Sequence, residues 1–220
     1  EMVKIPAGEF ALGFGPTSEL IPFISDKTAG LNAQPKQNLF LKTFYIDRHE
    51  TTYEDFIIFK PQARYPTKKP QEPVRGVSWF EADSYCHFIG KRLPTEFEWE
   101  KAARGFDDRL FVWGNKFIRE NANFSKIVYP VNMKNKDKSK FGVWGMNGNV
   151  SEWTSSWYKP YPNSIHKDVN YGKKFKVTRG GSIFKRKHGF MKEFTMIPYR
   201  NILPLNGRFW DTGFRCARSE

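Results

Sequence analysis

Three N-terminal capping boxes constrain the fold of this chain, because all of them precede Gly105 and no regular helix signal follows it. In a capping box, a Ser or Thr side chain accepts a hydrogen bond from the backbone amide three residues on, and a Glu there reaches back to the cap. The boxes pair Thr51 with Glu54, Ser78 with Glu81, and Thr95 with Glu98. They predict three short helices in the first half of the chain.

Four other stretches predict β-structure. Residues 2–12 indicate a short hairpin around a Pro-Ala-Gly turn, and residues 39–50 are rich in strand-forming side chains. Residues 174–184 predict a strand broken at its Gly-Gly pair, and residues 212–218 predict a terminal strand. With helices, strands and much irregular backbone together, the sequence predicts one α+β domain over residues 1–220.

The charge of the chain is distributed unevenly. The net charge of +13 divides into −1 for residues 1–110, with 15 Lys or Arg and 16 Asp or Glu, and +14 for residues 111–220, with 21 and 7. Such asymmetry favours an acidic protein partner, anionic lipid headgroups or nucleic acid, and the alternative is a solvated face. Nucleic acid is not expected because no nucleic-acid-binding motif accompanies the charge. No apolar run is long enough for a membrane span.

Several motifs together resemble the formylglycine-generating enzyme family, also called sulfatase-modifying-factor domains. They are "GKRLPTEFEWEKAARG" (90–105), "GNVSEW" (148–153), "RGGS" (179–182) and "GFR" (213–215). The resemblance implies one domain with a variant of the C-type-lectin fold and little regular secondary structure. Some members oxidise a sulfatase cysteine to formylglycine with copper and oxygen, and others form part of iron-dependent sulfoxide synthases. Many serve as binding or accessory modules outside the cytoplasm.

Neither enzyme class of the family is expected for this chain. The copper site needs two thiolates, which the family places between the "GGS" and "GFR" blocks, and residues 183–212 contain no cysteine. Phe190 and Thr195 occupy the two positions, and the tryptophan that many members carry before the "EW" glutamate is Ser151. The iron enzymes need three histidines in a separate helical domain, and no two of the four histidines here have helical spacing.

Calcium is possible at the "GNVSEW" loop, where family members often bind it. Gly148 and Val150 would offer backbone carbonyls and Glu152 a carboxylate, which are the oxygen ligands that calcium prefers. The usual Asp or Asn is Gly145 here, with Asn147 as a replacement. The alternative is that Glu152 is a buried carboxylate bonded to loop amides.

A second family calcium site is less favoured by the sequence. It needs an asparagine such as Asn123 and an acidic residue further along the chain. Residues 125–140 contain five lysines, and Asp137 is their one acidic residue. Calcium is therefore not expected at this second position.

The two cysteines lie in patterns that predict burial. Cys86 shares a helix face with Ala82 and Ile89, and Cys216 alternates in phase with Phe214. The resemblance implies that the two cysteines form a structural disulfide. The alternative is two free buried thiols in a cytoplasmic protein. A disulfide in turn indicates an oxidising compartment, so the expected location is the periplasm, the cell surface or the exterior.

The leading functional prediction is a non-catalytic family member that works outside the cytoplasm as a binding or accessory subunit of a larger protein assembly. One alternative is a maturation enzyme of unknown chemistry that acts on a partner protein in the family cleft. Another is a calcium-assisted, lectin-like ligand binder that uses Glu152. The candidate contact residues are Trp113, Trp144, Trp157, Lys185, Arg186, Lys187, Lys192 and Trp210.

Overall fold

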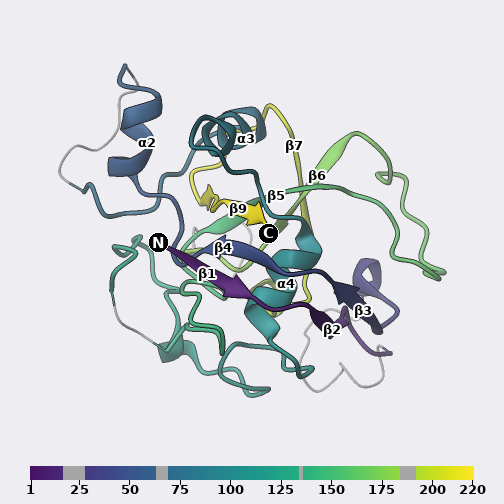
Figure 1. Cartoon of the computed structure of the whole chain (residues 1–220). Helices are drawn as coiled ribbons and strands as arrows, with labels where there is room; N and C mark the ends of the chain where they lie inside the picture. Colours follow the sequence, from purple (N-terminus) through teal and green to yellow (C-terminus); the bar gives the residue numbers. More distant parts are fainter. Residues whose placement is uncertain (17–27, 63–68, 134–135, 184–191) are drawn as a thin grey trace.

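The computed structural model describes residues 1–16, 28–62, 69–133, 136–183 and 192–220 (Figure 1). Its α-helices are α2 (Tyr53–Phe59), α3 (Trp79–Phe88) and α4 (Glu96–Arg104), and its 3-10 helices are η1 (Leu31–Ala33), η2 (Arg119–Asn121) and η3 (Lys192–Thr195). Its strands are β1 (Met2–Ile5), β2 (Gly8–Leu12), β3 (Gln37–Leu41), β4 (Phe44–Asp47), β5 (Ser151–Trp157), β6 (Phe175–Arg179), β7 (Asn201–Pro204), β8 (Thr212–Gly213) and β9 (Ala217–Ser219). The predicted α+β class is confirmed. No helix of the described residues is long and apolar enough to cross a membrane.

The strands form three sheets, ordered β1-β4-β9, β2-β3 and β7-β6-β5-β8. All pairs are antiparallel except β5 with β8. The predicted hairpin in residues 2–12 is wrong, because β1 pairs with β4 and β2 with β3. Partner numbers add to 49 throughout, as in Met2 with Asp47 and Leu12 with Gln37, so the two segments are neighbours along their whole length. Pro6 lacks an amide proton and interrupts this ladder without reversing the chain.

Two of the three predicted capping boxes are confirmed, at the start of α3 and of α4. The first box lies one residue later than predicted, with Thr52 as the cap and Asp55 as its partner. Thr51 is instead held in extended backbone, where its amide donates to the Phe214 carbonyl and its carbonyl accepts from the Val74 amide. Tertiary hydrogen bonds therefore decided the start of α2.

The predicted strands at 39–50 and 212–218 are each divided in two. The first becomes β3 and β4, and the second becomes β8 and β9, which belong to different sheets. Between β8 and β9 the chain passes through the core, where Phe214 and Cys216 are fully buried. The predicted strand at 174–184 ends as β6 at Arg179, just before Gly180, whose φ is 79°.

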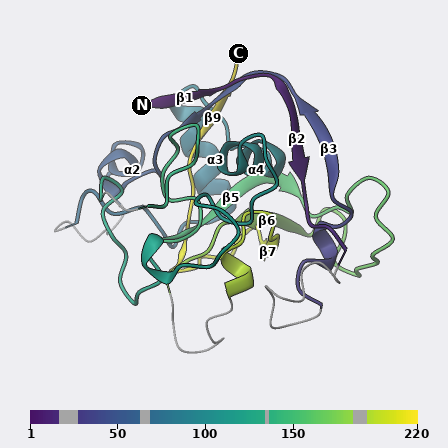
Figure 2. The same cartoon turned by 90° about the horizontal axis from the view of Figure 1, so that it is seen from below.

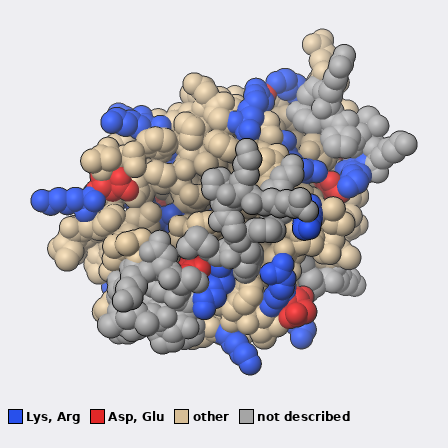
Figure 3. Space-filling view, turned by 180° about the vertical axis from the view of Figure 1, so that it is seen from behind, with Lys and Arg blue, Asp and Glu red and all other residues tan. Residues whose placement is uncertain are grey.

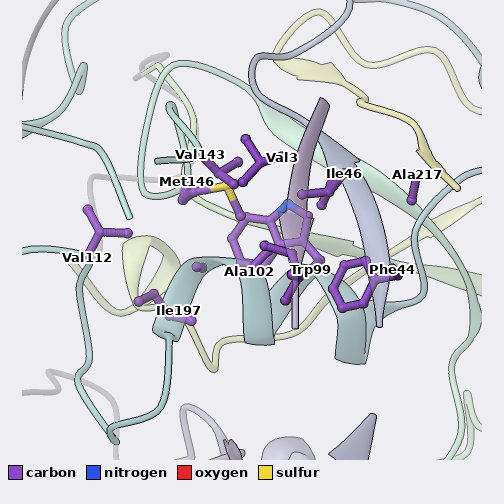
Figure 4. Packing of buried hydrophobic residues seen from close by; sticks show 12 residues of the cluster. Val3, Phe44, Ile46, Trp99, Ala102, Val112, Val143, Met146, Ile197 and Ala217 are labelled. Carbon is purple, nitrogen blue, oxygen red and sulfur yellow. The ribbon is translucent and has the colours of Figure 1, made fainter. Parts of the chain in front are cut away.

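Helix α4 lies at the centre of the domain and contacts β2, β5 and β6 (Figure 2). Its Trp99 is fully buried in a cluster that includes Val3 of β1 and Phe44 and Ile46 of β4 (Figure 4). Every residue of α4 except Phe97 is buried, although the helix carries five charged side chains in nine residues. The centre of the protein therefore has to accommodate charge as well as apolar volume.

Candidate functional site

The predicted disulfide between Cys86 and Cys216 is confirmed. The Sγ atoms are 2.00 Å apart and the Cα atoms 5.6 Å apart, so the bond joins α3 to the segment before β9. Both cysteines are fully buried, as predicted, and Phe214 lies in the same apolar cluster. The expected burial of Ile89 is wrong, because this residue caps the end of α3 and is 37% exposed.

The position that matches the second catalytic cysteine of the family is occupied by Thr195, a buried residue of η3. Its Oγ1 donates to the Lys192 carbonyl at 2.7 Å, and its carbonyl accepts from Asn147 Nδ2 at 2.6 Å. Phe190, at the first position, lies outside the described residues. The hydroxyl of Thr195 thus closes a helical turn, and both thiols of the chain are used in the disulfide.

Glu152 forms a buried ion pair with Arg215 at the centre of the "GNVSEW" region. Arg215 Nε donates to Glu152 Oε2 and Nη2 donates to Oε1, both at 2.7 Å. Trp99 Nε1 donates to Oε2 as well, at 2.9 Å. Both ionic side chains are fully buried, so this fork geometry gives each charge its partner away from water. Glu152 is buried, as the alternative interpretation expected, but the expected hydrogen bonds from loop amides are wrong. The guanidinium of Arg215 and the indole of Trp99 donate to its carboxylate instead.

Calcium does not fit the arrangement of Gly148, Val150 and Glu152. The guanidinium of Arg215 bonds both carboxylate oxygens of Glu152, and a calcium ion placed there would meet that positive charge. Asn147 was the expected replacement for the missing calcium ligand, but its Oδ1 already accepts a hydrogen bond from the Val112 amide at 2.9 Å. Among the described residues, no three His, Cys, Asp or Glu side chains are grouped to hold a metal ion.

Glu50 explains why residue 145 is a glycine. The φ of Gly145 is 71°, and a Cβ there would lie 2.7 Å from both carboxyl oxygens of Glu50. Glu50 is 3% exposed, its Oε1 accepts from Asn149 Nδ2 at 3.2 Å, and its Oε2 lies 3.8 Å from Arg215 Nη2. Burial raises the pKa of Glu50 to about 8, Arg215 opposes this rise, and the charge of Glu152 adds to it. The Glu50 carboxyl group, three residues after β4, therefore fills the space that a side chain at position 145 would need.

Asp137 is a second fully buried carboxyl group of this region. Its oxygens accept from the backbone amides of Asn147 and Gly148 at 2.9 to 3.0 Å. Burial raises the pKa of Asp137 to about 7 despite these amides. Asn123, which the family pattern would place with it, uses its Oδ1 to accept from the Ser125 amide and hydroxyl. These hydrogen bonds connect neighbouring loops and stabilise their conformation.

Comparison with known proteins identifies the family of this chain. Residues 1–220 match the sulfatase-modifying factor enzyme 1-like domain. The chain belongs to the formylglycine-generating enzyme family. The formylglycine-generating enzyme of Streptomyces coelicolor is 31% identical over 98% of this chain and 88% of its own length. The Bacillus subtilis protein YfmG is 28% identical over 99% of this chain and 54% of its own, and the mouse inactive C-alpha-formylglycine-generating enzyme 2 is 32% identical over 69% and 51%.

Solved structures show the same fold at lower identity. Treponema denticola variable protein 1 has a TM-score of 0.75 and 18% identity over 100% of this chain and 95% of its own. PvdO from Pseudomonas aeruginosa has a TM-score of 0.68 and 21% identity over 100% and 94%. The predicted family fold is therefore confirmed. The chain spans about half the length of YfmG and of the mouse protein.

A polar cavity of about 350 Å³ opens beside Glu50 in this family member. Five carboxyl groups line it, those of Glu1, Asp47, Glu50, Glu54 and Asp55, together with Lys91 and His49. Lys91 pairs with Asp47 at 2.6 Å, and burial, with Arg215 and Arg48, lowers the pKa of His49 to about 4. Such a lining suits a cationic or hydrogen-bond-donating group better than an anion. The sequence signal for this cavity was the acidic run "YIDRHETTYED" (45–55), which was not predicted to form a site.

The four candidate tryptophans are all half-buried and lie in four different local environments of this family fold. Trp144 stacks beside His49, Trp113 stacks on Phe111, Trp157 lies over Lys176 Nζ at 3.9 Å, and Trp210 packs on the cluster of Val128, Val150 and Ile183. Lys192 begins η3, whereas Lys185, Arg186 and Lys187 lie outside the described residues. Lysine and arginine side chains are spread over the face in Figure 3 rather than gathered at one point. Their role as a contact surface stays a prediction.

Proposed function

We propose that this chain is a non-catalytic domain of the formylglycine-generating enzyme family that works outside the cytoplasm as a binding or accessory subunit of a larger protein assembly. The observation that carries the proposal is the use of both cysteines in one buried disulfide. Copper(I) in the family's oxidases needs soft thiolate ligands, and residues 183–212 supply none. The inactive C-alpha-formylglycine-generating enzyme 2 of mouse is a precedent, by its name, for a relative without this activity.

The proposed location and partner rest on two further observations. A disulfide persists in an oxidising compartment and is rare in the cytoplasm, which supports the periplasm, the cell surface or the exterior. The net charge of +14 in residues 111–220 supports a partner with an acidic surface. Since the chain spans about half the length of several relatives, the assembly can include segments of the same polypeptide as well as other proteins.

The catalytic part of the proposal is tested by adding copper(I), oxygen and a sulfatase-derived cysteine peptide to the purified protein. We expect no oxygen consumption and no aldehyde product, while the Streptomyces coelicolor enzyme gives both under the same conditions. Aldehyde formation by the present chain would overturn the non-catalytic assignment.

The disulfide and the accessory role are tested on protein isolated from its native source under mild conditions. Intact mass should rise by two hydrogens on reduction, and the chain should elute as part of a stoichiometric complex. Two free thiols in the native protein would contradict the location, and a chain that elutes alone from every native fraction would contradict the accessory role.

A further inference from the structure

The connection between β5 and β6, residues 158–174, displays two aliphatic side chains to solvent. We call it the β5–β6 loop. Ile165 is 96% exposed and Val169 is 88% exposed, which are the two highest values among the large hydrophobic residues that the structure describes. The loop extends away from the body of the domain in both ribbon views (Figures 1 and 2). Single exposed aliphatic residues are common on protein surfaces, but two on one protruding loop call for a reason.

The β5–β6 loop is held in shape by its own hydrogen bonds. The hydroxyl of Tyr158 donates to Asp168 Oδ2 at 2.8 Å, and the Asn170 amide donates to Asp168 Oδ1 at 2.9 Å. The Gly172 amide donates to the Tyr158 carbonyl at 2.9 Å, and the rings of Tyr158 and Tyr171 lie 4.6 Å apart. The ordered backbone therefore holds Ile165 and Val169 in water, and binding of the loop would require little further ordering.

The charge of the loop is strongly positive. Its four lysines, Lys159, Lys167, Lys173 and Lys174, are all exposed, and none forms an ion pair with a described residue. Asp168 is the one acidic residue of positions 158–174, so the loop carries four positive charges and one negative, a net charge of +3. The Asp168 carboxylate is also turned to Tyr158 and Asn170, which leaves the lysines to face an approaching partner.

The composition of the β5–β6 loop favours a lipid surface over a folded protein as its binding partner. Protein interfaces are anchored mainly by aromatic and Arg side chains that enter pockets, but Tyr158 and Tyr161 of this loop are buried in their own domain. Aliphatic side chains with nearby lysines suit a fluid surface, since the aliphatic groups enter the acyl boundary while the lysine stems reach the headgroup phosphates. Anionic headgroups attract each lysine that comes within a Debye length of them.

We propose that the β5–β6 loop docks this domain on an anionic lipid surface, with Ile165 and Val169 inserted at the boundary between headgroups and acyl chains. The lysines of the loop would contact the headgroup phosphates. This surface activity goes beyond the accessory role proposed above, and either one can fail without the other.

The test uses co-sedimentation of the whole chain with lipid vesicles. We expect binding to vesicles made of equal parts phosphatidylcholine and phosphatidylglycerol, weaker binding as salt is added, and little binding to phosphatidylcholine alone. Ile165→Ser with Val169→Ser should lower the association constant by roughly tenfold to a hundredfold, because the inserted apolar area is lost. Lys173→Glu with Lys174→Glu should also lower it at least several-fold.

Matched controls place the same changes elsewhere. Ile58→Ser with Ile127→Ser alters two aliphatic side chains that are 69% and 60% exposed, and Lys126→Glu with Lys136→Glu alters two exposed lysines. These variants should bind vesicles like the wild type, or with a much smaller loss for the charge change. All the altered side chains are exposed, so melting temperatures should agree and will show whether each variant is folded.

Three outcomes would overturn the proposal. The first is a wild-type chain that does not bind the anionic vesicles at low salt. The second is a serine double variant that binds both vesicles and poly-L-glutamate like the wild type, which would show simple charge attraction. The third is a serine double variant that keeps vesicle binding but loses a native protein complex, which would assign the loop to a protein partner.

Discussion

Among the buried carboxyl groups of the described residues, two sets differ in what lies against them. Glu96, Glu100 and Glu152 are each bonded by at least one buried arginine, namely Arg200, Arg104 with Arg179, and Arg215. Glu50 and Asp137 are equally buried. Asn149 Nδ2 donates to Glu50, whose contact with Arg215 Nη2 is longer, at 3.8 Å, and the backbone amides of Asn147 and Gly148 donate to Asp137. The first set lies in α4 and its neighbouring strand β5, and the second lies in loops, where Glu50 lines the polar cavity.

The difference shows that buried charges can affect both the stability of a fold and the pH dependence of that stability. A guanidinium fork supplies a full opposite charge, so the carboxylate and the arginine hold distant segments together as one unit. Amides supply only partial charges, and Arg215 acts on Glu50 from a longer distance than on Glu152. Burial therefore raises the pKa of Glu50 to about 8 and that of Asp137 to about 7. The first set should therefore govern how stable the fold is, and the second how that stability depends on pH.

Breaking the Glu152–Arg215 pair should produce the largest effect. Arg215→Met leaves the Glu152 carboxylate buried without its counter-charge, and we expect the free energy of unfolding to fall by roughly 3 to 5 kcal/mol. Urea denaturation followed by tryptophan fluorescence measures this change. Glu152→Gln in the Arg215→Met background should recover part of the loss, because it removes the unpaired charge.

The exposed ion pair between Lys4 and Glu220 provides the matched control. Its side chains are 56% and 58% exposed, so Lys4→Met should leave the free energy of unfolding nearly unchanged. If Arg215→Met were as mild as Lys4→Met, the central ion pairs would not govern the stability of the fold.

The pH dependence of stability should follow Glu50 and Asp137. Their pKa values in the folded protein are about 8 and about 7, whereas the unfolded chain ionises both near pH 4. Between pH 6.5 and 8 the folded state thus binds more protons than the unfolded state, so the free energy of unfolding falls as the pH rises. The loss over this range should be on the order of 2 kcal/mol.

The pH range begins at 6.5 because His49 has the opposite effect on the free energy of unfolding below this pH. Its pKa is about 4 in the folded protein, so its contribution to stability is lost as the pH falls from 6.5. Urea midpoints at several pH values between 6.5 and 8 measure the slope for the wild type and for Glu50→Gln. The variant should lose most of the slope, and an unchanged slope would show that Glu50 is ionised in the folded protein throughout.

The sequence allowed most of the fold to be predicted where local signals agree with tertiary contacts. The caps of α3 and α4 and the facing of Cys86 are local properties, and the structure has them as predicted. The long ladder between residues 2–12 and 37–47 was missed, because strand partners far apart in sequence leave no local signal at Pro6. The division of residues 212–218 between two sheets depends in the same way on long-range pairing.

The candidate site was harder to predict because it depends on which buried charge meets which. The sequence indicated that Glu152 is special, but nothing in its spacing identified Arg215, which is 63 residues away, as its partner. Gly145 was read as a missing ligand, and the structure shows a glycine that makes room for Glu50. Contacts of this kind join residues that are far apart in the sequence, so they can be recognised only in the folded structure.

The smallest expected effect concerns Lys176, a buried positive charge that forms no ion pair with a carboxylate of the described residues. Its Nζ lies 4.1 Å from the ring of Trp79 and 3.9 Å from that of Trp157, and it donates to the Ser155 carbonyl at 2.7 Å. Trp157→Leu keeps an apolar cover but removes the negative face of one ring, and it should lower the free energy of unfolding by about 1 kcal/mol. In the Lys176→Met background the same change should cost clearly less, as a double-mutant cycle in urea would measure. Equal costs in both backgrounds would show that Trp157 does not stabilise this ammonium, which would leave Trp157 available as the contact residue that the sequence predicts.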